Sequence, residues 1–531
     1  MKAIAEFTDK DSVAKALTIG VLFLIVLRFA LAFYYPVFSD ACMYFYQAKQ
    51  IAANPSLLIA PNIGYFPPLL FIIGAFMHTL LGEIGLKLIA PTFGAIGIYY
   101  TYRLGCELFD EKKGLLAALF VGIIPSHIYL SSMGYMDSMV TGLSIAFVYY
   151  FHQTVKSNSS KGVVLVGVLA GLTALSKFTG LVVFPFIVMY FVLSLMMPLM
   201  KGLHLQNTLP TLKENLKNIK IPTGLLKNSL CISLIGLIVC SPYYLRNWLL
   251  FGDPLWGGGG TIHPSGSFGA DVTTYALSAQ TMAAYRPSST IIDFVKEAYL
   301  TCWGIPQGRF DTISFIPSYV ILGFLGLTIL LSLVIFYGAI QEFKEEKNLP
   351  IWAWMLTWVI AILILQKQLL WGFRRLLPIA PFLALFAGYG FDKTKIKKIG
   401  YLLLILAVIG CSTSQIGKAW YANDYFDKHS DSLQYLKTLP EDAIVLTPYG
   451  EQTIYYSEKK PMPLAGLDLA AFNLTTLQRY NITHVVRTET YLWQDLSAHN
   501  NIIDKMAEEG QLKLVWQSEY VKIYEVDYGD L

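Results

Sequence analysis

Residues 17–35, LTIGVLFLIVLRFALAFYY, decide the fold class of this chain, because they are almost entirely apolar and contain one charge, Arg28. An α-helix needs about 20 mainly apolar residues to cross a bilayer. Comparable runs recur along the chain, near 86–105, 114–132, 138–154, 163–176, 179–198, 228–245, 318–340, 351–368, 376–391 and 399–417. The sequence therefore predicts an α-helical polytopic membrane protein with about eleven spans.

The composition agrees with this prediction. Of the 531 residues, 55% are hydrophobic and 14% are charged, whereas soluble domains carry about 25% charged residues. These values exclude a soluble enzyme and a disordered chain, and the continuous apolar runs exclude a lipid-facing β-barrel. The net charge of +4 gives no reason to expect a nucleic-acid partner. The six cysteines form no CxxC pair, so neither a zinc site nor a disulfide framework is predicted.

The distribution of lysines predicts the orientation. Lys2, Lys10 and Lys15 precede the first span, which favours a cytoplasmic N-terminus in the plasma membrane. The later basic connections fall on the same side only if the short apolar stretch Pro67–Leu81 re-enters the membrane or lies in its interface. These connections are Lys112/Lys113, Lys156/Lys161, Lys201–Lys227, Lys344/Lys347 and Lys393–Lys398. The C-terminus is then external.

This topology leaves two external loops, 36–66 and 246–317, and an external tail. Within the first loop, residues 41–53 mix aromatic and polar side chains and predict a helix in the membrane interface. After a membrane domain over 1–419, residues 420–531 become richer in Asp and Glu and predict an extracytoplasmic α/β domain. Its expected strands are Ala443–Thr447, Ile482–Thr488 and Lys513–Trp516.

Two carboxylates stand out at the predicted outer face. Asp40 follows the first span, and Asp137 occupies a very short external turn. An Asp inside a membrane costs roughly 2.5–3.5 kcal/mol, so such residues usually face a polar cavity. Both are candidate catalytic residues, and both are the candidate ligands if a divalent metal is used. The alternative is that each simply caps the helix that follows it.

Cations are predicted on the same face: Lys177, Arg246, Arg374 and Arg375. An arginine binds phosphate oxygens through a planar fork and a lysine supplies a point charge, so these residues are candidate phosphate ligands. The alternative for Arg375 is snorkelling to lipid headgroups. His263 in the long outer loop is a further candidate for the substrate cleft, although an isolated histidine is more often a simple polar residue.

Several short motifs occur in a characteristic order. They are Tyr65–Leu69 (YFPPL), Leu175–Lys177 (LSK), Pro242–Asn247 (PYYLRN) followed by Phe251–Pro254 (FGDP), and Phe373–Pro378 (FRRLLP). Together with Asp40 and Asp137, this pattern resembles the polytopic GT-C-type glycosyltransferases over roughly residues 15–390. That superfamily includes the protein O-mannosyltransferases and the aminoarabinose transferases of lipid A.

The resemblance implies that a sugar moves from a polyprenyl (dolichyl-type) phosphate donor to an acceptor hydroxyl on a lipid, glycan or protein at the external face. It implies an inverting displacement with Asp40 as general base and Tyr65 in the substrate cleft. Arg374 corresponds to the arginine of the last motif, where Arg375 replaces a tyrosine.

Other departures also matter. Relatives that modify lipid A carry a lysine where this chain has Phe66, and Tyr491–Asp495 does not match the WWDYG motif of oligosaccharyltransferases. A membrane transporter or flippase is the alternative function, but transporters place ionisable groups near the midplane and often contain inverted repeats. A non-catalytic scaffold would not need so many spans.

Overall fold

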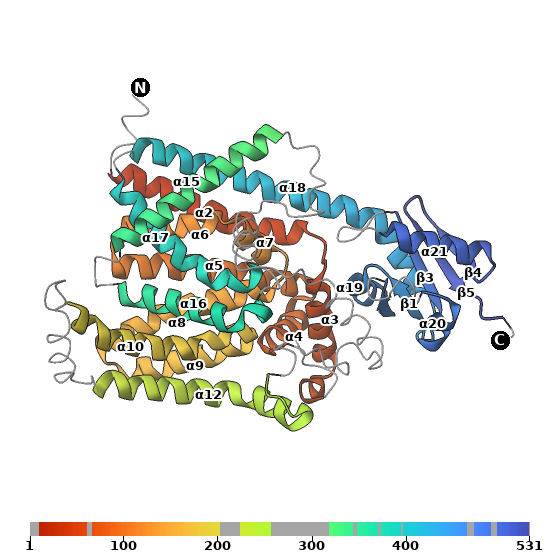
Figure 1. The fold of residues 1–531 in the computed structure, drawn as a ribbon, viewed down its shortest axis with the longest axis horizontal. Helices are drawn as coiled ribbons and strands as arrows, with labels where there is room; N and C mark the ends of the chain where they lie inside the picture. The colour runs from red at the N-terminus through yellow and green to blue at the C-terminus, as the bar shows by residue number, and fades with distance from the viewer. Residues whose placement is uncertain are drawn as a thin grey trace.

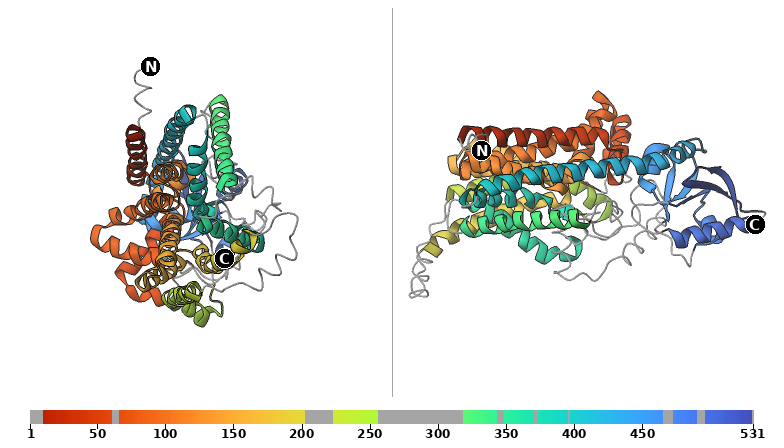
Figure 2. Two further views of the ribbon diagram at one scale, coloured as in Figure 1. Left: turned by 90° about the vertical axis from the view of Figure 1, so that its left-hand side faces the viewer. Right: turned by 90° about the horizontal axis from the view of Figure 1, so that it is seen from above.

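The computed structural model describes residues 10–60, 66–201, 223–255, 318–342, 348–369, 373–394, 397–464, 472–489 and 496–529. Helices lie side by side along the long axis of the molecule, and a small sheet-containing domain stands at one end (Figures 1 and 2). Tyr65 and His263 lie outside the described residues, as does the outer loop from residue 256 to 317.

The helices occupy most of the predicted apolar runs. The N-terminal half of the bundle contains α2 (Lys10–Tyr34), α3 (Asp40–Ala53), η1 (Pro55–Ile59), α4 (Leu69–Leu81), α5 (Glu83–Leu108), α6 (Glu111–Ile123), α7 (Pro125–Ser132) and α8 (Met136–Ser157). The remainder consists of α9 (Ser160–Ser176), η2 (Phe178–Val182), α10 (Val183–Lys201), α12 (Thr223–Phe251), α15 (Ser318–Glu342), α16 (Leu349–Leu369), η5 (Phe373–Ile379), α17 (Ala380–Lys393) and α18 (Lys397–Lys437).

Within the described residues, four helical segments are long and apolar enough to cross a membrane, and a bent pair would make a fifth. Large apolar side chains stay exposed on outward faces, among them Leu22 of α2, Leu234 of α12 and Phe336 of α15. A soluble protein rarely exposes such contiguous apolar surface. The bundle is therefore that of a multi-pass membrane protein, and the number of eleven spans stays a prediction.

Two predicted boundaries need correction. The run 114–132 is not one straight helix, because it breaks at Ile124 into α6 and α7, which meet at 66°. Pro125, which begins α7, has no N–H to continue the ladder of α6. The outer loop does not begin at 246, because α12 continues to Phe251 and includes Arg246.

A buried arginine bridges α6 and α7 at the point where the helix breaks. Arg28 of α2 is fully buried, donates to the carbonyl of Gly122 (2.9 Å) and lies 2.9 Å from Nδ1 of His127. The carbonyls at a helix C-terminus lack partners and carry partial negative charge, so a cation stabilises them. Arg28 therefore holds the bend that directs α7 and the start of α8.

Two lysine–carboxylate pairs mark one end of the bundle. At the end away from the C-terminal domain, Lys112 pairs with Asp392 at 3.0 Å and Lys156 with Glu107 at 2.7 Å. The predicted cytoplasmic lysines at 112 and 156 thus lie near helix ends, while α3 lies at the opposite end, near the C-terminal domain (Figure 1).

The predicted helix over 41–53 is confirmed as α3. α4 has 13 residues and is about 20 Å long, less than the roughly 30 Å hydrocarbon thickness.

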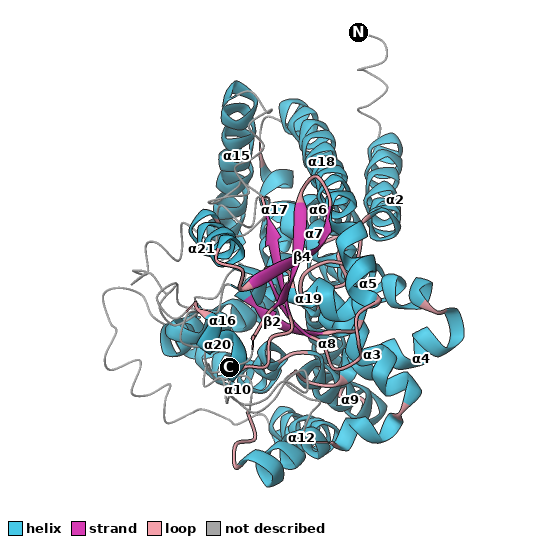
Figure 3. Ribbon diagram, turned by 90° about the vertical axis from the view of Figure 1, so that its right-hand side faces the viewer, coloured by secondary structure: helices cyan, strands magenta, loops and turns pink. Residues whose placement is uncertain are grey.

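The C-terminal domain is built on a five-stranded sheet of order β2-β1-β3-β5-β4 (Figure 3). β1 is parallel to β2 and β3, and β5 is antiparallel to β3 and β4. Its elements are β1 (Ile444–Thr447), α19 (Gly450–Gln452), the π-helical turn η6 (Thr453–Ser457), β2 (Lys460–Pro463), α20 (Leu474–Arg479), β3 (His484–Thr488), α21 (Ser497–Glu508), β4 (Leu512–Gln517) and β5 (Val521–Val526).

The α/β character of this tail and its three predicted strands agree with the structure, whereas β2 and β5 were missed. α18 runs without a break for 41 residues into the domain. The proposed boundary between residues 419 and 420 lies inside this helix and stays a prediction, as does the external location of the domain.

Candidate active site

Asp40 stands at the start of α3, where its carboxylate faces the bundle. The residue before it, Ser39, is the N-cap and makes no side-chain capping bond. Oδ2 of Asp40 is paired instead with Nη1 of Arg374 from η5, and the hydroxyl of Tyr44 donates to the same oxygen at 3.4 Å. The structure thus brings together the predicted carboxylate and the predicted arginine from positions 334 residues apart.

This acid–base pair is accessible. The side chains of Asp40 and Arg374 keep 23% and 37% of their surface exposed. The guanidinium carbon of Arg374 lies 5.6 Å from the ring centroid of Tyr135, a cation–π distance. The rings of Tyr44 and Tyr135 meet edge to face at 6.5 Å. Two tyrosines therefore frame a charged pair that a ligand can reach.

Asp137 has a different environment. It lies in the first turn of α8, is fully buried, and binds Nζ of Lys177 through Oδ1 at 2.5 Å. Lys177 joins α9 to η2 and its side chain is 9% exposed. Within the described part of the chain, Oδ2 of Asp137 finds no hydrogen-bond partner. Asp137 and Lys177 thus form a buried ion pair, whereas the pair of Asp40 and Arg374 is partly exposed to solvent.

The two pairs act on one another electrostatically. The partial enclosure of Arg374 by protein would by itself lower its pKa, but Asp40 first and Asp137 next raise this pKa above its usual range. Both carboxylates also act on the phenol of Tyr44. Asp40 and Asp137 thus lie at the same end of the bundle, connected through Tyr44 and Tyr135, and the external location of this end stays a prediction.

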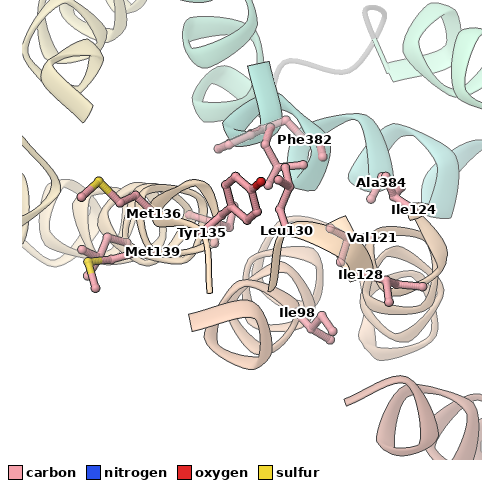
Figure 4. Packing of buried hydrophobic residues seen from close by; sticks show 14 of the residues in the cluster. Ile98, Val121, Ile124, Ile128, Leu130, Tyr135, Met136, Met139, Phe382 and Ala384 are labelled. Atoms are coloured by element: carbon pink, nitrogen blue, oxygen red, sulfur yellow. The ribbon is translucent and has the colours of Figure 1, made fainter. Parts of the chain in front are cut away.

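A buried apolar cluster packs around Tyr135, whose ring contacts Arg374. Tyr135, Met136 and Met139 at the start of α8 belong to the same core as Phe382 of α17 (Figure 4). Tyr135 and Met136 are 4% and 0% exposed. The side chains that surround Arg374 are consequently held by close packing rather than by a loop.

The other predicted cations are placed differently. On α12, Arg246 donates to the backbone carbonyl of Ala60 and, at 2.8 Å, to Oδ1 of Asn247. It connects α12 to the segment that follows η1. The backbone of Arg375 belongs to η5, but its side chain lies outside the described set, together with Tyr65 and His263. Their roles stay predictions.

Three residues near the site were not predicted from sequence. Tyr44 and Tyr135 could have been found, because Tyr44 is one helical turn after Asp40 and Tyr135 is two residues before Asp137. The third, Glu451, comes from α19 of the C-terminal domain, which packs against α3. Burial, with a smaller effect from Asp40, raises the pKa of Glu451. Nothing in the sequence connects Glu451 with α3.

The described residues do not fit a metal site. Among them, no three His, Cys, Asp or Glu side chains gather in a way that could hold an ion. Asp40 and Asp137, the two candidate ligands, are each already paired with a cationic side chain.

Comparison with known proteins gives one family match. Residues 66–207, which include α4 to α10, match the family described as dolichyl-phosphate-mannose-protein mannosyltransferase. None of the curated proteins matches the chain by sequence.

Three solved structures share the fold. The chain is similar to ArnT from Cupriavidus metallidurans bound to undecaprenyl phosphate, with a TM-score of 0.59, 12% identity, and coverage of 97% of this chain and 98% of that one. The Archaeoglobus fulgidus oligosaccharyltransferase tethered with an acceptor peptide gives a TM-score of 0.56 and 15% identity over 91% of this chain and 70% of that one. AglB from the same organism, in complex with an inhibitory peptide and a dolichol-phosphate, gives 0.51 and 15% over 88% and 69%.

These matches agree with the motifs read from the sequence. The family match lies within the region that carries them, and the ArnT fold extends over nearly the whole chain. The predicted resemblance is confirmed: residues 66–207 match a mannosyltransferase family, and the chain has the fold of ArnT and of the archaeal oligosaccharyltransferase.

Proposed function

We propose that this protein transfers a sugar from a polyprenyl (dolichyl-type) phosphate to an acceptor hydroxyl, with inversion at the anomeric carbon. The observation that carries the proposal is the accessible pair of Asp40 and Arg374, in which a carboxylate and a guanidinium share one site. The acceptor belongs to a lipid, a glycan or a protein. The solved relatives with undecaprenyl phosphate, dolichol-phosphate or an acceptor peptide support this class of substrates.

In this mechanism Asp40 is the general base. It removes the proton of the acceptor hydroxyl while that oxygen forms a bond to the anomeric carbon. On the opposite side of the sugar, the bond from this carbon to the phosphate oxygen breaks, and polyprenyl phosphate leaves with the electron pair. A phosphate is a good leaving group, so no second carboxylic acid is needed, unlike in glycoside hydrolysis.

Arg374 stabilises the departing phosphate. A guanidinium has five N–H donors, and Asp40 engages one of its terminal nitrogens. The remaining donors can bind phosphate oxygens, so that one residue orients the base and neutralises the leaving group. The burial of Asp137 and Lys177 favours a supporting role for this pair beneath the site.

The reaction takes place at the end of the bundle that carries the C-terminal domain, which we assign to the external face of the plasma membrane. The lysines at 112 and 156, which lie near the opposite end of the bundle, support a cytoplasmic N-terminus. Since the acid–base pair lies near one end of the helices and not at their middle, this arrangement favours a transferase over a transporter or flippase.

The experiment that tests the function uses purified full-length protein with a polyprenyl-phosphate donor whose sugar is radiolabelled. The expected result is release of polyprenyl phosphate with transfer of the label to an acceptor in a membrane extract, or to water. A transporter or flippase would move the donor across a vesicle membrane with no covalent change. That outcome would overturn the proposal.

Replacing Arg374 by methionine is expected to lower the rate of transfer about 10²–10³-fold, because the departing phosphate loses its charge partner. Arg374→Lys should recover part of this loss, since a lysine keeps the charge without the planar fork. Initial rates over a range of donor concentrations measure both variants. Arg479→Met, on α20, is the matched control and should leave the rate unchanged. An Arg374→Met variant with more than half of the wild-type rate would contradict the phosphate role.

A further inference from the structure

The turn that leads into Asp40 is strained. Ser39 has φ 52° and ψ −140°, a region that residues with a Cβ atom rarely adopt. Such a conformation is energetically costly and persists only when the surrounding structure holds it. Because Asp40 is the next residue, whatever holds Ser39 also determines where the carboxylate points.

A tyrosine of the C-terminal domain binds this turn directly. The hydroxyl of Tyr456 in η6 donates to the backbone carbonyl of Val37 at 3.0 Å. The same carbonyl also accepts from Sγ of Cys42, at 3.2 Å. The ring of Tyr456 is fixed by Phe426 of α18, at 4.9 Å between centroids. The carbonyl two residues before the strained serine is therefore held by a rigid side chain from another domain.

The neighbouring tyrosine holds the other half of α3. Tyr455 donates its hydroxyl to Oε1 of Glu83 at 3.0 Å, and the same oxygen accepts from Nζ of Lys49 at 2.5 Å. Nζ of Lys49 also lies 4.2 Å from the ring centroid of Tyr455. Two consecutive residues of η6 thus fix the turn before α3 and, through Glu83, its C-terminal part.

We propose that Tyr456 is a positioning residue, through which the docked C-terminal domain keeps the turn 37–39 in the conformation that aims Asp40 at the acceptor. Both η6 and α19 pack against α3, and Figure 1 shows α19 beside it. Transfer therefore requires the domain to be in contact with α3. The inference deepens the proposed function and rests on it for the role of Asp40.

The test compares two tyrosine-to-phenylalanine variants of the full chain. Tyr456→Phe removes the hydroxyl that binds Val37 and is expected to lower kcat for sugar transfer at least tenfold, because misplacement of a reacting group by about 1 Å can cost 10²-fold. The KM for the donor should change less than twofold, since Arg374 is untouched. Tyr528→Phe is the matched control, because Tyr528 also donates to a backbone carbonyl, that of Ile482, within the same domain. It should keep the wild-type kcat.

A second substitution tests the strain itself. Glycine adopts the backbone conformation of Ser39 without the cost of a Cβ atom. Adding Ser39→Gly to Tyr456→Phe should therefore restore at least part of the lost kcat. Full activity of Tyr456→Phe, an equal loss in Tyr528→Phe, or no recovery in the double variant would each overturn the proposal.

Hydrogen exchange separates this inference from the proposed function. Amide exchange of residues 38–45 should become faster in Tyr456→Phe and stay unchanged in Tyr528→Phe, and this readout needs no substrate. If wild-type protein turns over no donor but the exchange differs as expected, the proposed function fails while the positioning contact stands. Equal exchange in wild type and Tyr456→Phe overturns the positioning role.

Discussion

Asp40→Asn is expected to lower the rate of sugar transfer by about 10²–10⁴-fold, the range that general base catalysis usually contributes. Asparagine has nearly the same shape and keeps an oxygen that can accept from Arg374, but it cannot take the proton of the acceptor hydroxyl. The measurement is single-turnover transfer of labelled sugar at saturating donor. Donor affinity should change little, because the phosphate ligand Arg374 is retained.

The control for this variant is Asp424→Asn. Asp424 is a carboxylate of similar exposure on α18, paired with Lys428 one helical turn away at 2.6 Å. Exposed pairs of this kind contribute little to stability, so the control should keep the wild-type rate and thermal stability. Near-normal turnover by Asp40→Asn would remove Asp40 from the role of base.

The second large effect concerns stability. Removing one member of the buried pair of Asp137 and Lys177 should lower the free energy of unfolding by about 3–5 kcal/mol, because the remaining buried charge loses this ion pair. Asp137→Asn and Lys177→Met are therefore both expected to have markedly lower Tm values in detergent. The double variant carries neither charge and should recover most of the loss.

Activity of the double variant then separates two roles for Asp137. If the pair only supports the site, the double variant regains transfer together with stability. If its Tm recovers while transfer stays low, Asp137 contributes to the reaction itself. Single variants with unchanged Tm would contradict the buried ion pair.

Much of the architecture could be predicted from local sequence patterns. Apolar runs of sufficient length identified the helices, among them the 13-residue α4, and the prediction from charge placement that Pro67–Leu81 is not a full span stays a prediction. The break in 114–132 also had a local signal, Pro125. The strand β2 (KPMP) did not, because two prolines in four residues argue against a strand except at a sheet edge, which is where β2 lies.

The residues of the candidate site could be predicted from the sequence, but the contacts between them could not. The motif resemblance and the predicted outer face selected Asp40, Asp137, Lys177 and Arg374, yet only the fold decides that Arg374 binds Asp40 and Lys177 binds Asp137. The contributions of Glu451, Tyr455 and Tyr456 had no local signal. They depend on how a distant domain docks against α3.

The fully buried Arg28 has a consequence for how the chain is made. Its partners outside α2, the Gly122 carbonyl and the His127 ring, follow 94 and 99 residues later. An arginine at the centre of an isolated span costs roughly 2.5–3.5 kcal/mol during insertion. Helix α2 therefore emerges from the ribosome with a charge whose one partner within that helix is the Leu24 carbonyl, at 2.6 Å. The remaining hydrogen bonds of the guanidinium form only after about a hundred further residues are synthesised, which couples the final packing of α2 to the arrival of α6 and α7.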